Sequence, residues 1–200
     1  MMFESMDDCV AFTGHRSYDG AGDAELAAML VRLRAAGRSL FLSGMAMGFD
    51  LAAAEAVLRL RARDGGVRLM AVVPFVGQER AFPTADRRRY DRVLEAADEV
   101  RLLAPGYYKG CDAERNNFLV DHAAEVMAWY DGRPAGTRYT VDRALRLGRR
   151  LHTPCPSPPT SPHPEPTLSC AALPLWATTP LLRRRPSRRR MGRQSPSRRQ

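Results

Sequence analysis

The chain has 200 residues, of which 44% are hydrophobic, and these values fit one globular domain with an appendage. Its formal net charge of +9 is unevenly distributed, because residues 1–150 have a net charge of +1 and residues 151–200 have a net charge of +8. The charge therefore excludes a basic nucleic-acid-binding domain in the first part, and nucleic acid is expected to bind only through the basic last part.

The N-terminus and the cysteines both favour a cytoplasmic protein. Residues 1–8 lack the apolar segment of a signal peptide, and no apolar run approaches the roughly 20 residues that span a bilayer. The four cysteines form no CxxC pair and have no spacing typical of a metal site. We therefore expect a reduced, cytoplasmic protein that binds neither a metal nor a membrane.

Segments with the pattern of buried strands alternate five times with segments of helical periodicity. The expected strands span residues 10–12, 39–42, 69–73, 100–103 and 126–130. The expected helices span residues 23–36, 51–58, 85–97, 112–124 and 137–147. The run Leu69–Val73 is apolar throughout, which is typical of a parallel strand covered on both faces. The alternation predicts an α/β fold, a Rossmann-like doubly wound parallel sheet of about five strands within residues 1–150.

A change of composition near residue 150 predicts where this domain ends. Arg149–His152 is where a sixth strand is due, but prolines follow from Pro154 onward, and proline cannot continue a central strand. Residues 151–200 contain 11 of the 15 prolines together with runs of arginine, so we predict a disordered tail. Three interpretations of this tail stay open: a basic arm for nucleic acid or another acidic surface, a solvated linker, or a changed reading frame that replaced the native C-terminus.

Polar residues and glycines follow the predicted strands. Thr13-Gly14-His15-Arg16 follows the first strand, Ser43–Asp50 the second, and Asp131–Thr137 the fifth. Right-handed crossovers place the carboxyl ends of parallel strands on one rim, where open α/β sheets bind their ligands. The sequence therefore predicts a ligand pocket at this rim.

The segment Ser43–Asp50 joins a predicted strand to a predicted helix, as in α/β proteins that bind phosphate at a glycine-bearing turn. Gly44 and Gly48 have the spacing GxxxG, which is neither the dinucleotide motif nor a Walker A motif, so close packing of strand and helix is an equal alternative. Ser43 could cap the helix or donate to a phosphate. Asp50 would repel a phosphate, so we expect it to be a cap or a ribose acceptor.

The other candidates also have structural alternatives. Gly136-Thr137 opens the last predicted helix and could bind an anion or simply cap that helix. Arg16 and Arg115 could each pair with a phosphate through two hydrogen bonds, although Arg115 could equally be a solvated helix arginine. His15 is more often a hydrogen-bonded structural histidine than a base.

Six groups of residues follow one another between Val10 and Gly148. They are Thr13–Arg16; Ser43–Gly48 with Ala53–Glu55; Pro74–Phe75 with Gly77–Gln78; Arg89–Tyr90 with Ala97–Asp98; Arg115–Asn116 with Val120–Asp121; and Asp131–Gly132 with Gly136–Thr137 and Thr140–Val141. In this order they resemble the YpsA-like branch of the SLOG superfamily, a Rossmann-like group that also includes the SMF/DprA proteins and the LOG enzymes. The resemblance implies a nucleotide-derived, ADP-ribose-like ligand over the Ser43–Gly48 loop and the Gly136-Thr137 turn.

The same resemblance suggests two alternative functions. LOG enzymes are phosphoribohydrolases that cleave nucleoside monophosphates, with the signature PGGxGTxxE and an upstream Arg-Lys pair. Here Thr140 stands in place of their glutamate, and Arg115-Asn116 in place of their Arg-Lys. Because the reaction needs a carboxylate, Glu55 or Asp131 would have to replace that glutamate. Glu55 otherwise needs an ion-pair partner on its alanine-rich helix face. The second alternative is SMF/DprA-like DNA binding.

We therefore expect a pocket that binds or senses a nucleotide-derived ligand without turning it over. We expect no other cofactor, and a homodimer is possible. The residues expected to bind the ligand are Thr13, Gly14, His15, Arg16, Ser43, Gly44, Met45, Gly48, Glu55, Arg115, Asn116, Asp131, Gly136 and Thr137.

Overall fold

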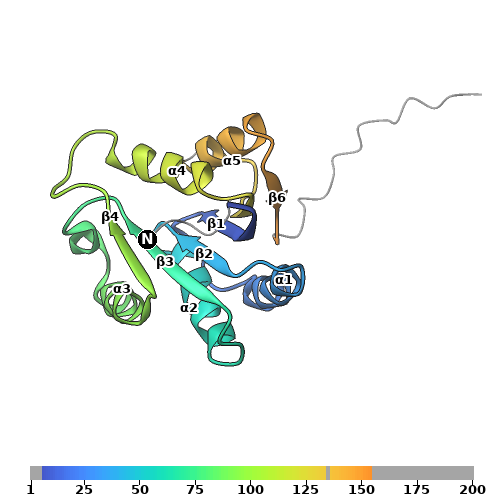
Figure 1. Ribbon diagram of the computed structural model, residues 1–200. Helices are drawn as coiled ribbons and strands as arrows, with labels where there is room; N and C mark the ends of the chain where they lie inside the picture. The colour runs from blue at the N-terminus through green and yellow to red at the C-terminus, as the bar shows by residue number, and fades with distance from the viewer. Residues whose placement is uncertain (1–5, 134–135, 155–200) are drawn as a thin grey trace, which may run out of the picture. The chain divides into compact units, whose positions relative to one another are not determined.

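The computed structural model describes residues 6–133 and 136–154, which form a six-stranded sheet covered by helices (Figure 1). The strands are β1 (Cys9–Gly14), β2 (Leu40–Ser43), β3 (Arg68–Val73), β4 (Glu99–Leu102), β5 (Glu125–Trp129) and β6 (Arg150–His152). Their order across the sheet is β4-β3-β2-β1-β5-β6, and every neighbouring pair is parallel.

An α-helix follows each of the first five strands, as the alternation in the sequence predicted. The helices are α1 (Asp23–Ala35), α2 (Phe49–Arg61), α3 (Thr84–Ala96), α4 (Cys111–Asp121) and α5 (Gly136–Arg146), with two short 3-10 helices, η1 (Met6–Asp8) and η2 (Gln78–Ala81). Helices α1, α2 and α3 cover one face of the sheet, and α4 and α5 cover the other (Figure 1). The predicted Rossmann-like α/β fold is confirmed.

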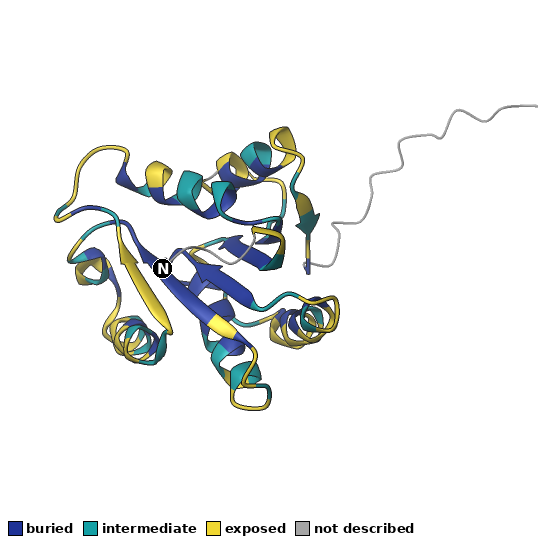
Figure 2. Cartoon of the chain, in the orientation of Figure 1, coloured by how far each residue is buried: buried dark blue, intermediate teal, exposed yellow. Residues whose placement is uncertain are grey.

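Strand β3 shows why an uninterrupted apolar run was needed. Leu69, Ala71 and Val73 belong to the hydrophobic core beneath α1, α2 and α3. Met70 and Val72 belong to the core on the opposite face, beneath α4 and α5. All five side chains are buried, and the interior strands appear dark blue in Figure 2. Because successive strand residues point to opposite faces, a strand between two cores must be apolar at every position.

The sheet has one strand more than the sequence predicted. β6 pairs with β5 through Arg150, Leu151 and His152, and all three precede Pro154, so the missing N–H of proline does not interrupt the pairing. Glu125 of β5 is buried, and its side chain contacts the imidazole of His152. The expectation of a sixth strand cut off by proline was therefore wrong. The predicted disordered tail lies outside the described residues from residue 155 onward.

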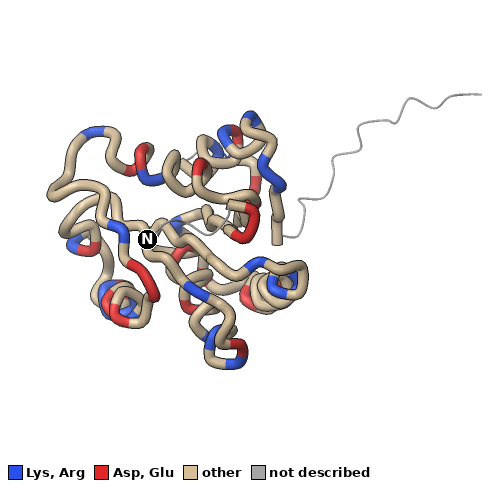
Figure 3. The backbone as a smooth tube through the Cα atoms, viewed as in Figure 1, with Lys and Arg blue, Asp and Glu red and all other residues tan. Residues whose placement is uncertain are grey.

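Charged side chains of both signs are interspersed along the described part of the chain (Figure 3), which agrees with the net charge of +1 for residues 1–150. None of the helices in this part has the length and apolar character that crossing a bilayer requires.

The order of the strands reverses beside β1. From β1 the chain adds β2, β3 and β4 toward one edge of the sheet, and it then returns through α4 to place β5 on the other side of β1. The loops after β1 and β5 therefore lead to opposite faces of the sheet. Doubly wound sheets leave a crevice for a ligand at this point, outside the carboxyl ends of the strands.

Candidate ligand-binding site

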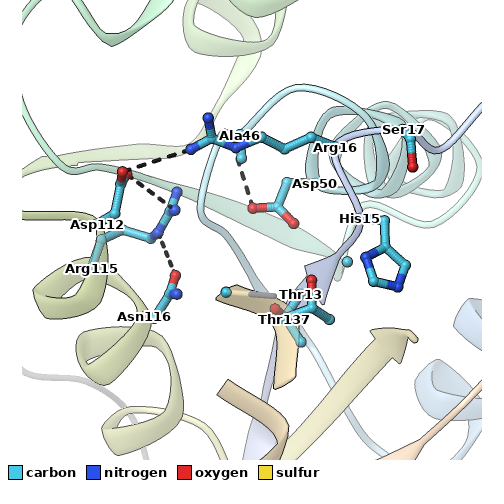
Figure 4. Close-up of a pocket in the computed structure, with 12 residues that line it drawn as sticks. Thr13, His15, Arg16, Ser17, Ala46, Asp50, Asp112, Arg115, Asn116 and Thr137 are labelled. Carbon is cyan, nitrogen blue, oxygen red and sulfur yellow. Dashed lines mark hydrogen bonds and ion pairs between the residues drawn. The ribbon is translucent and has the colours of Figure 1, made fainter. Parts of the chain in front are cut away.

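A cavity of about 450 Å³ lies at this crevice, on the predicted rim of the sheet. It is bordered by the end of β1 and the loop after it, the loop between β2 and α2, the first half of α4 and the first turn of α5 (Figure 4). The lining residues are Thr13, Gly14, His15, Arg16, Ser17, Ala46, Asp50, Asp112, Arg115, Asn116, Gly136 and Thr137.

Two features of the lining favour an anion. The side chain of Arg16 is 58% exposed, and its Nη2 atom lies 3.6 Å from Oδ2 of Asp112. Gly136 and Thr137 begin the eleven-residue helix α5, whose first N–H groups lack partners within the helix and whose dipole is positive at this end. The cavity therefore combines an exposed guanidinium, held by one long ion pair, with a helix N-terminus.

Asp50 is a buried carboxyl group in the cavity wall, and only 5% of the residue is exposed. Burial raises the pKa of this carboxyl to about 6, which outweighs the opposing effect of the nearby Arg115 guanidinium. Its Oδ2 atom accepts one long hydrogen bond, at 3.4 Å, from the N–H of Ala46. Asp50 is therefore a carboxyl that exchanges its proton near neutral pH.

Arg115 is buried as well, but the protein itself engages its guanidinium. It donates to the carbonyl oxygen of Gly44, and its Nε donates to Oδ1 of Asn116 at 2.7 Å. Its Nη2 atom lies 3.5 Å from Oδ1 of Asp112. Burial lowers the pKa of Arg115, and the charges of Asp50 and Asp112 oppose that effect. This arginine joins α4 to the loop after β2.

Side chains hold the loop between β2 and α2 in place. Ser43 Oγ donates to the carbonyl oxygen of Asp50 at 2.9 Å and accepts from the N–H of Met45 at 3.2 Å. Met45 is buried with φ at 57°, and its carbonyl oxygen accepts a hydrogen bond of 2.5 Å from Nε2 of Gln78. Gln78, which was not among the expected site residues, therefore supports a backbone conformation that side-chain-bearing residues rarely adopt.

The two glycines of this loop allow close packing. A Cβ atom on Gly44 would lie 2.8 Å from both Cδ of Arg115 and Oδ2 of Asp50. Gly48 has a φ of +82°, and a Cβ there would lie 2.5 Å from the carbonyl oxygen of His15. Gly44 thus lets the loop approach Arg115 of α4, and Gly48 lets it approach the backbone after β1, so the close contacts are not limited to the strand and helix that the loop joins.

His15 borders the cavity and is tied to the loop after β5. Its Nε2 atom lies 2.9 Å from Oδ1 of Asp131, and Oδ2 of Asp131 accepts a hydrogen bond of 2.6 Å from Nε of Arg133. Arg133, and to a smaller extent His15, hold the pKa of Asp131 well below its usual value. The charged Asp131 therefore orients the imidazole from outside the cavity lining.

Glu55 lies apart from the cavity. Its two carboxylate oxygens accept hydrogen bonds of 2.9 Å from Nε and Nη2 of Arg89. It borders a separate cavity of about 200 Å³, together with Tyr18 and Asp23. Glu55 has the ion-pair partner that the sequence required, and the structure does not bring it to the crevice.

The family model of the YspA SLOG family (YpsA) matches residues 23–154. The chain belongs to this family. The match begins after the first loop, so the resemblance at Thr13–Arg16 lies outside the matched range. Helices α1 to α5 and strands β2 to β6 lie within it.

Two bacterial proteins are similar in sequence to this chain. The uncharacterised SPbeta prophage-derived protein YoqJ of Bacillus subtilis is 28% identical over 125 residues, which cover 56% of this chain and 73% of YoqJ. A UPF0398 protein of Halalkalibacterium halodurans is 31% identical over 109 residues, covering 53% of this chain and 58% of that protein.

Solved structures of DNA processing protein A (DprA) have a similar fold. The Streptococcus pneumoniae protein has a TM-score of 0.56 and 25% identity, over 72% of this chain and 49% of that chain. The Helicobacter pylori protein, described with its single-stranded DNA binding mode, has a TM-score of 0.53 and 18% identity, over 72% and 63% of the two chains. This member of the YspA SLOG family therefore spans less than two thirds of either DprA chain and of the UPF0398 protein.

The crevice of this YspA SLOG family member brings together part of the expected set. Expected residues in the cavity lining are Thr13, Gly14, His15, Arg16, Arg115, Asn116, Gly136 and Thr137, whereas Ser43, Gly44, Met45, Gly48, Asp131 and Glu55 lie outside it. The lining adds Ser17, Ala46, Asp50 and Asp112, which were not on the expected list. Asp112 stands one helical turn before Arg115, so helix periodicity could have found it. Within the described residues no cluster of three potential metal ligands occurs.

Proposed function

We propose that the cavity binds a small nucleotide-derived ligand, such as an ADP-ribose-like molecule, and that the protein senses or binds this ligand. One observation carries the proposal: the exposed Arg16 and the first turn of α5 border a single cavity where the strand order reverses. A guanidinium and a helix N-terminus are the two kinds of donor with which α/β proteins hold phosphate.

The acidic lining restricts how such a ligand would lie. Asp50 and Asp112 border the same cavity, and their carboxylates would repel a phosphate placed beside them. The same carboxylates accept hydrogen bonds from hydroxyl and amino groups. A ligand with its anionic end at Thr137 and at the side of Arg16 that faces away from Asp112, and with its hydroxyl groups toward Asp50 and Asp112, satisfies both conditions. A ribose phosphate has this character.

Ligand binding by the full chain tests the proposal. We would measure thermal unfolding with AMP, ADP, ADP-ribose and NAD, followed by calorimetric titration of any compound that stabilises the protein. A ligand present at 100 times its Kd adds roughly 2.7 kcal/mol to the free energy of unfolding. Arg16→Ala is expected to weaken binding about tenfold or more, because a charge-assisted hydrogen bond is lost.

Arg138→Ala is the matched control. Arg138 is 54% exposed and lies 3.6 Å from Asp142, nearly the same exposure and ion-pair distance as Arg16; it follows Thr137 in α5, but it is not itself in the cavity lining. If none of the compounds stabilises the folded chain, or if both alanine variants weaken binding equally, the proposal fails.

Asp50 supports a second candidate, in which the ligand is a nucleoside monophosphate that the protein hydrolyses. A carboxyl with a pKa of about 6 in the cavity wall can exchange a proton with a ligand near neutral pH, as N-glycosidic cleavage requires. Chromatography of each ligand mixture after incubation would detect a released base. If every ligand stays intact, the result favours a protein that binds the ligand without hydrolysing it. Cleavage that disappears in Asp50→Asn favours the hydrolase.

The likeness to the DNA processing protein A of Streptococcus pneumoniae, at 25% identity, supports DNA as a third candidate. Fluorescence anisotropy with a labelled oligothymidylate would detect it. Binding that falls steeply with salt and is unaffected by Arg16→Ala would indicate the basic residues after residue 150 as the contact. Binding that Arg16→Ala abolishes would instead indicate the cavity.

A further inference from the structure

Strand β4 forms one edge of the sheet and has an exposed outer side. All four of its residues are exposed, in contrast to the interior strands (Figure 2). Within the described residues, β3 is the one strand that pairs with it. The outer backbone N–H and C=O groups of β4 are therefore available to another strand.

Apolar side chains gather around this edge. Of the ten exposed large hydrophobic residues in the described part of the chain, five belong to β4 or to the loops that follow β3 and β4. They are Val76, Val100, Leu102, Tyr107 and Tyr108, here called the β4 patch. The ring of Phe75 lies 5.3 Å from that of Tyr107, which shows that the two loops adjoin. A concentration of exposed apolar side chains is typical of a surface that another protein covers.

The pairing of β4 with β3 places the apolar residues and the charged residues of β4 on opposite faces. Val100 is opposite Ala71, and Leu102 is opposite Val73, so both lie on the face that carries α1, α2 and α3. Glu99 and Arg101 lie on the other face. The strand thus alternates acidic, apolar, basic and apolar.

We propose that β4 pairs antiparallel with β4 of a second copy of this chain, about a two-fold axis at Val100. A two-fold axis perpendicular to the sheet keeps each residue on its own face, so the axis must lie midway between one residue and its own counterpart in the second copy. Placed at Val100, it sets Glu99 opposite Arg101 of the second copy, twice, and Val100 opposite its own counterpart. The half-exposed Val100 then gains its own counterpart as an apolar neighbour, whereas Leu102 lies opposite Asp98 of the second copy and diagonally beside its Val100.

The other registers are less favourable. An axis at Glu99 sets two carboxylates opposite each other, and an axis at Arg101 sets two guanidinium groups opposite each other. An axis at Leu102 leaves both charges opposite uncharged residues. The order of charges in β4 is therefore self-complementary in one register, which is why a second copy fits this edge better than an unrelated strand.

A charge exchange tests this register. Sedimentation equilibrium of the full chain over a range of concentrations is expected to show a dimer. Arg101→Glu and Glu99→Arg should each weaken dimerisation roughly tenfold, because each sets like charges opposite each other twice. The double variant should restore the dimer, since it exchanges the signs. Arg138→Glu, on α5, is the control, and thermal unfolding of each variant verifies folding.

A disulfide tests the axis directly, in a chain with Cys155→Ser and Cys170→Ser. Residues directly opposite in an antiparallel pair have Cα atoms about 4.5–5.5 Å apart, within the range that a disulfide spans. Val100→Cys should therefore form a covalent dimer on mild oxidation. Arg101→Cys should not, because its two copies would be offset along the strands. A monomer at every concentration, or a double charge variant that associates no better than the single variants, would overturn the proposal.

Discussion

Arg115 and Arg16 line the same cavity, both lie within 3.6 Å of Asp112, and both were considered as phosphate ligands, yet they differ in exposure and in their other hydrogen bonds. The Arg115 side chain is 5% exposed and donates to Gly44 and Asn116. The Arg16 side chain is 58% exposed and has one ion pair at 3.6 Å. A buried guanidinium needs protein acceptors of its own, which leaves few donors for a ligand. Residue type and position on the rim therefore do not identify a ligand-binding arginine, whereas exposure and unengaged donors do.

The largest expected effect comes from Arg115→Met. This change removes the buried cation, leaves the carbonyl of Gly44 without this donor, and removes the charge that most strongly opposes the effect of burial on the pKa of Asp50. Breaking a buried charge pair by removing one partner costs about 3–5 kcal/mol. We expect a loss of this size in the free energy of unfolding, measured by urea denaturation of the full chain.

Arg115→Lys separates the effect of losing the charge from the effect of losing the hydrogen bonds of the guanidinium. Lysine keeps the charge but lacks the planar fork that reaches both Gly44 and Asn116, so an intermediate loss is expected. If Arg115→Met costs less than about 1 kcal/mol, the guanidinium is not structural, and the contrast with Arg16 disappears.

The next effect is a pH dependence that originates at Asp50. Because burial raises the pKa of this carboxyl to about 6, the folded state holds the proton more tightly than the unfolded state does. The associated stability is present below about pH 4 and is lost as the pH rises through 6. One pKa unit corresponds to about 1.4 kcal/mol, so ionising Asp50 costs the folded state roughly 3 kcal/mol.

Asp50→Asn removes this titration. Urea denaturation from pH 4 to pH 8 is expected to show the variant gaining stability relative to the unmodified chain as the pH rises. Asp64 and Asp131, whose pKa values are lowered by ion pairs, are present in both proteins and cancel in the difference. Two parallel stability curves would mean that Asp50 does not exchange its proton in this range.

The fold could be predicted because its signals are local. The apolar run Leu69–Val73 and the alternation of strands with helices depend on neighbouring residues, and the structure follows them. A sixth strand was due at Arg149–His152 but was taken to be cut off by the prolines from Pro154 onward, whereas β6 ends before them. It depends on pairing with β5 and on the distant contact between Glu125 and His152.

Only those residues of the site that lie at the ends of strands, or begin the following helix, could be predicted from the sequence. The rim position of Thr13–Arg16 and Gly136-Thr137 follows from topology, and both segments line the cavity. The contact of Gln78 with Met45, across 33 residues, has no local signal. Glu55 shows the opposite error, because its buried-looking helix face is turned toward Arg89 and away from the crevice.

The smallest expected effect on stability is that of Arg16→Ala. Exposed ion pairs contribute about 0–1 kcal/mol, and this pair is long at 3.6 Å, so the free energy of unfolding should change by less than about 0.5 kcal/mol. Urea denaturation beside Arg138→Ala, whose ion pair has the same length, checks this value. A loss as large as that of Arg115→Met would make Arg16 a structural residue. An unchanged stability would instead mean that the folded chain does not depend on the ion pair between Arg16 and Asp112. The Arg16 guanidinium is then available to a ligand.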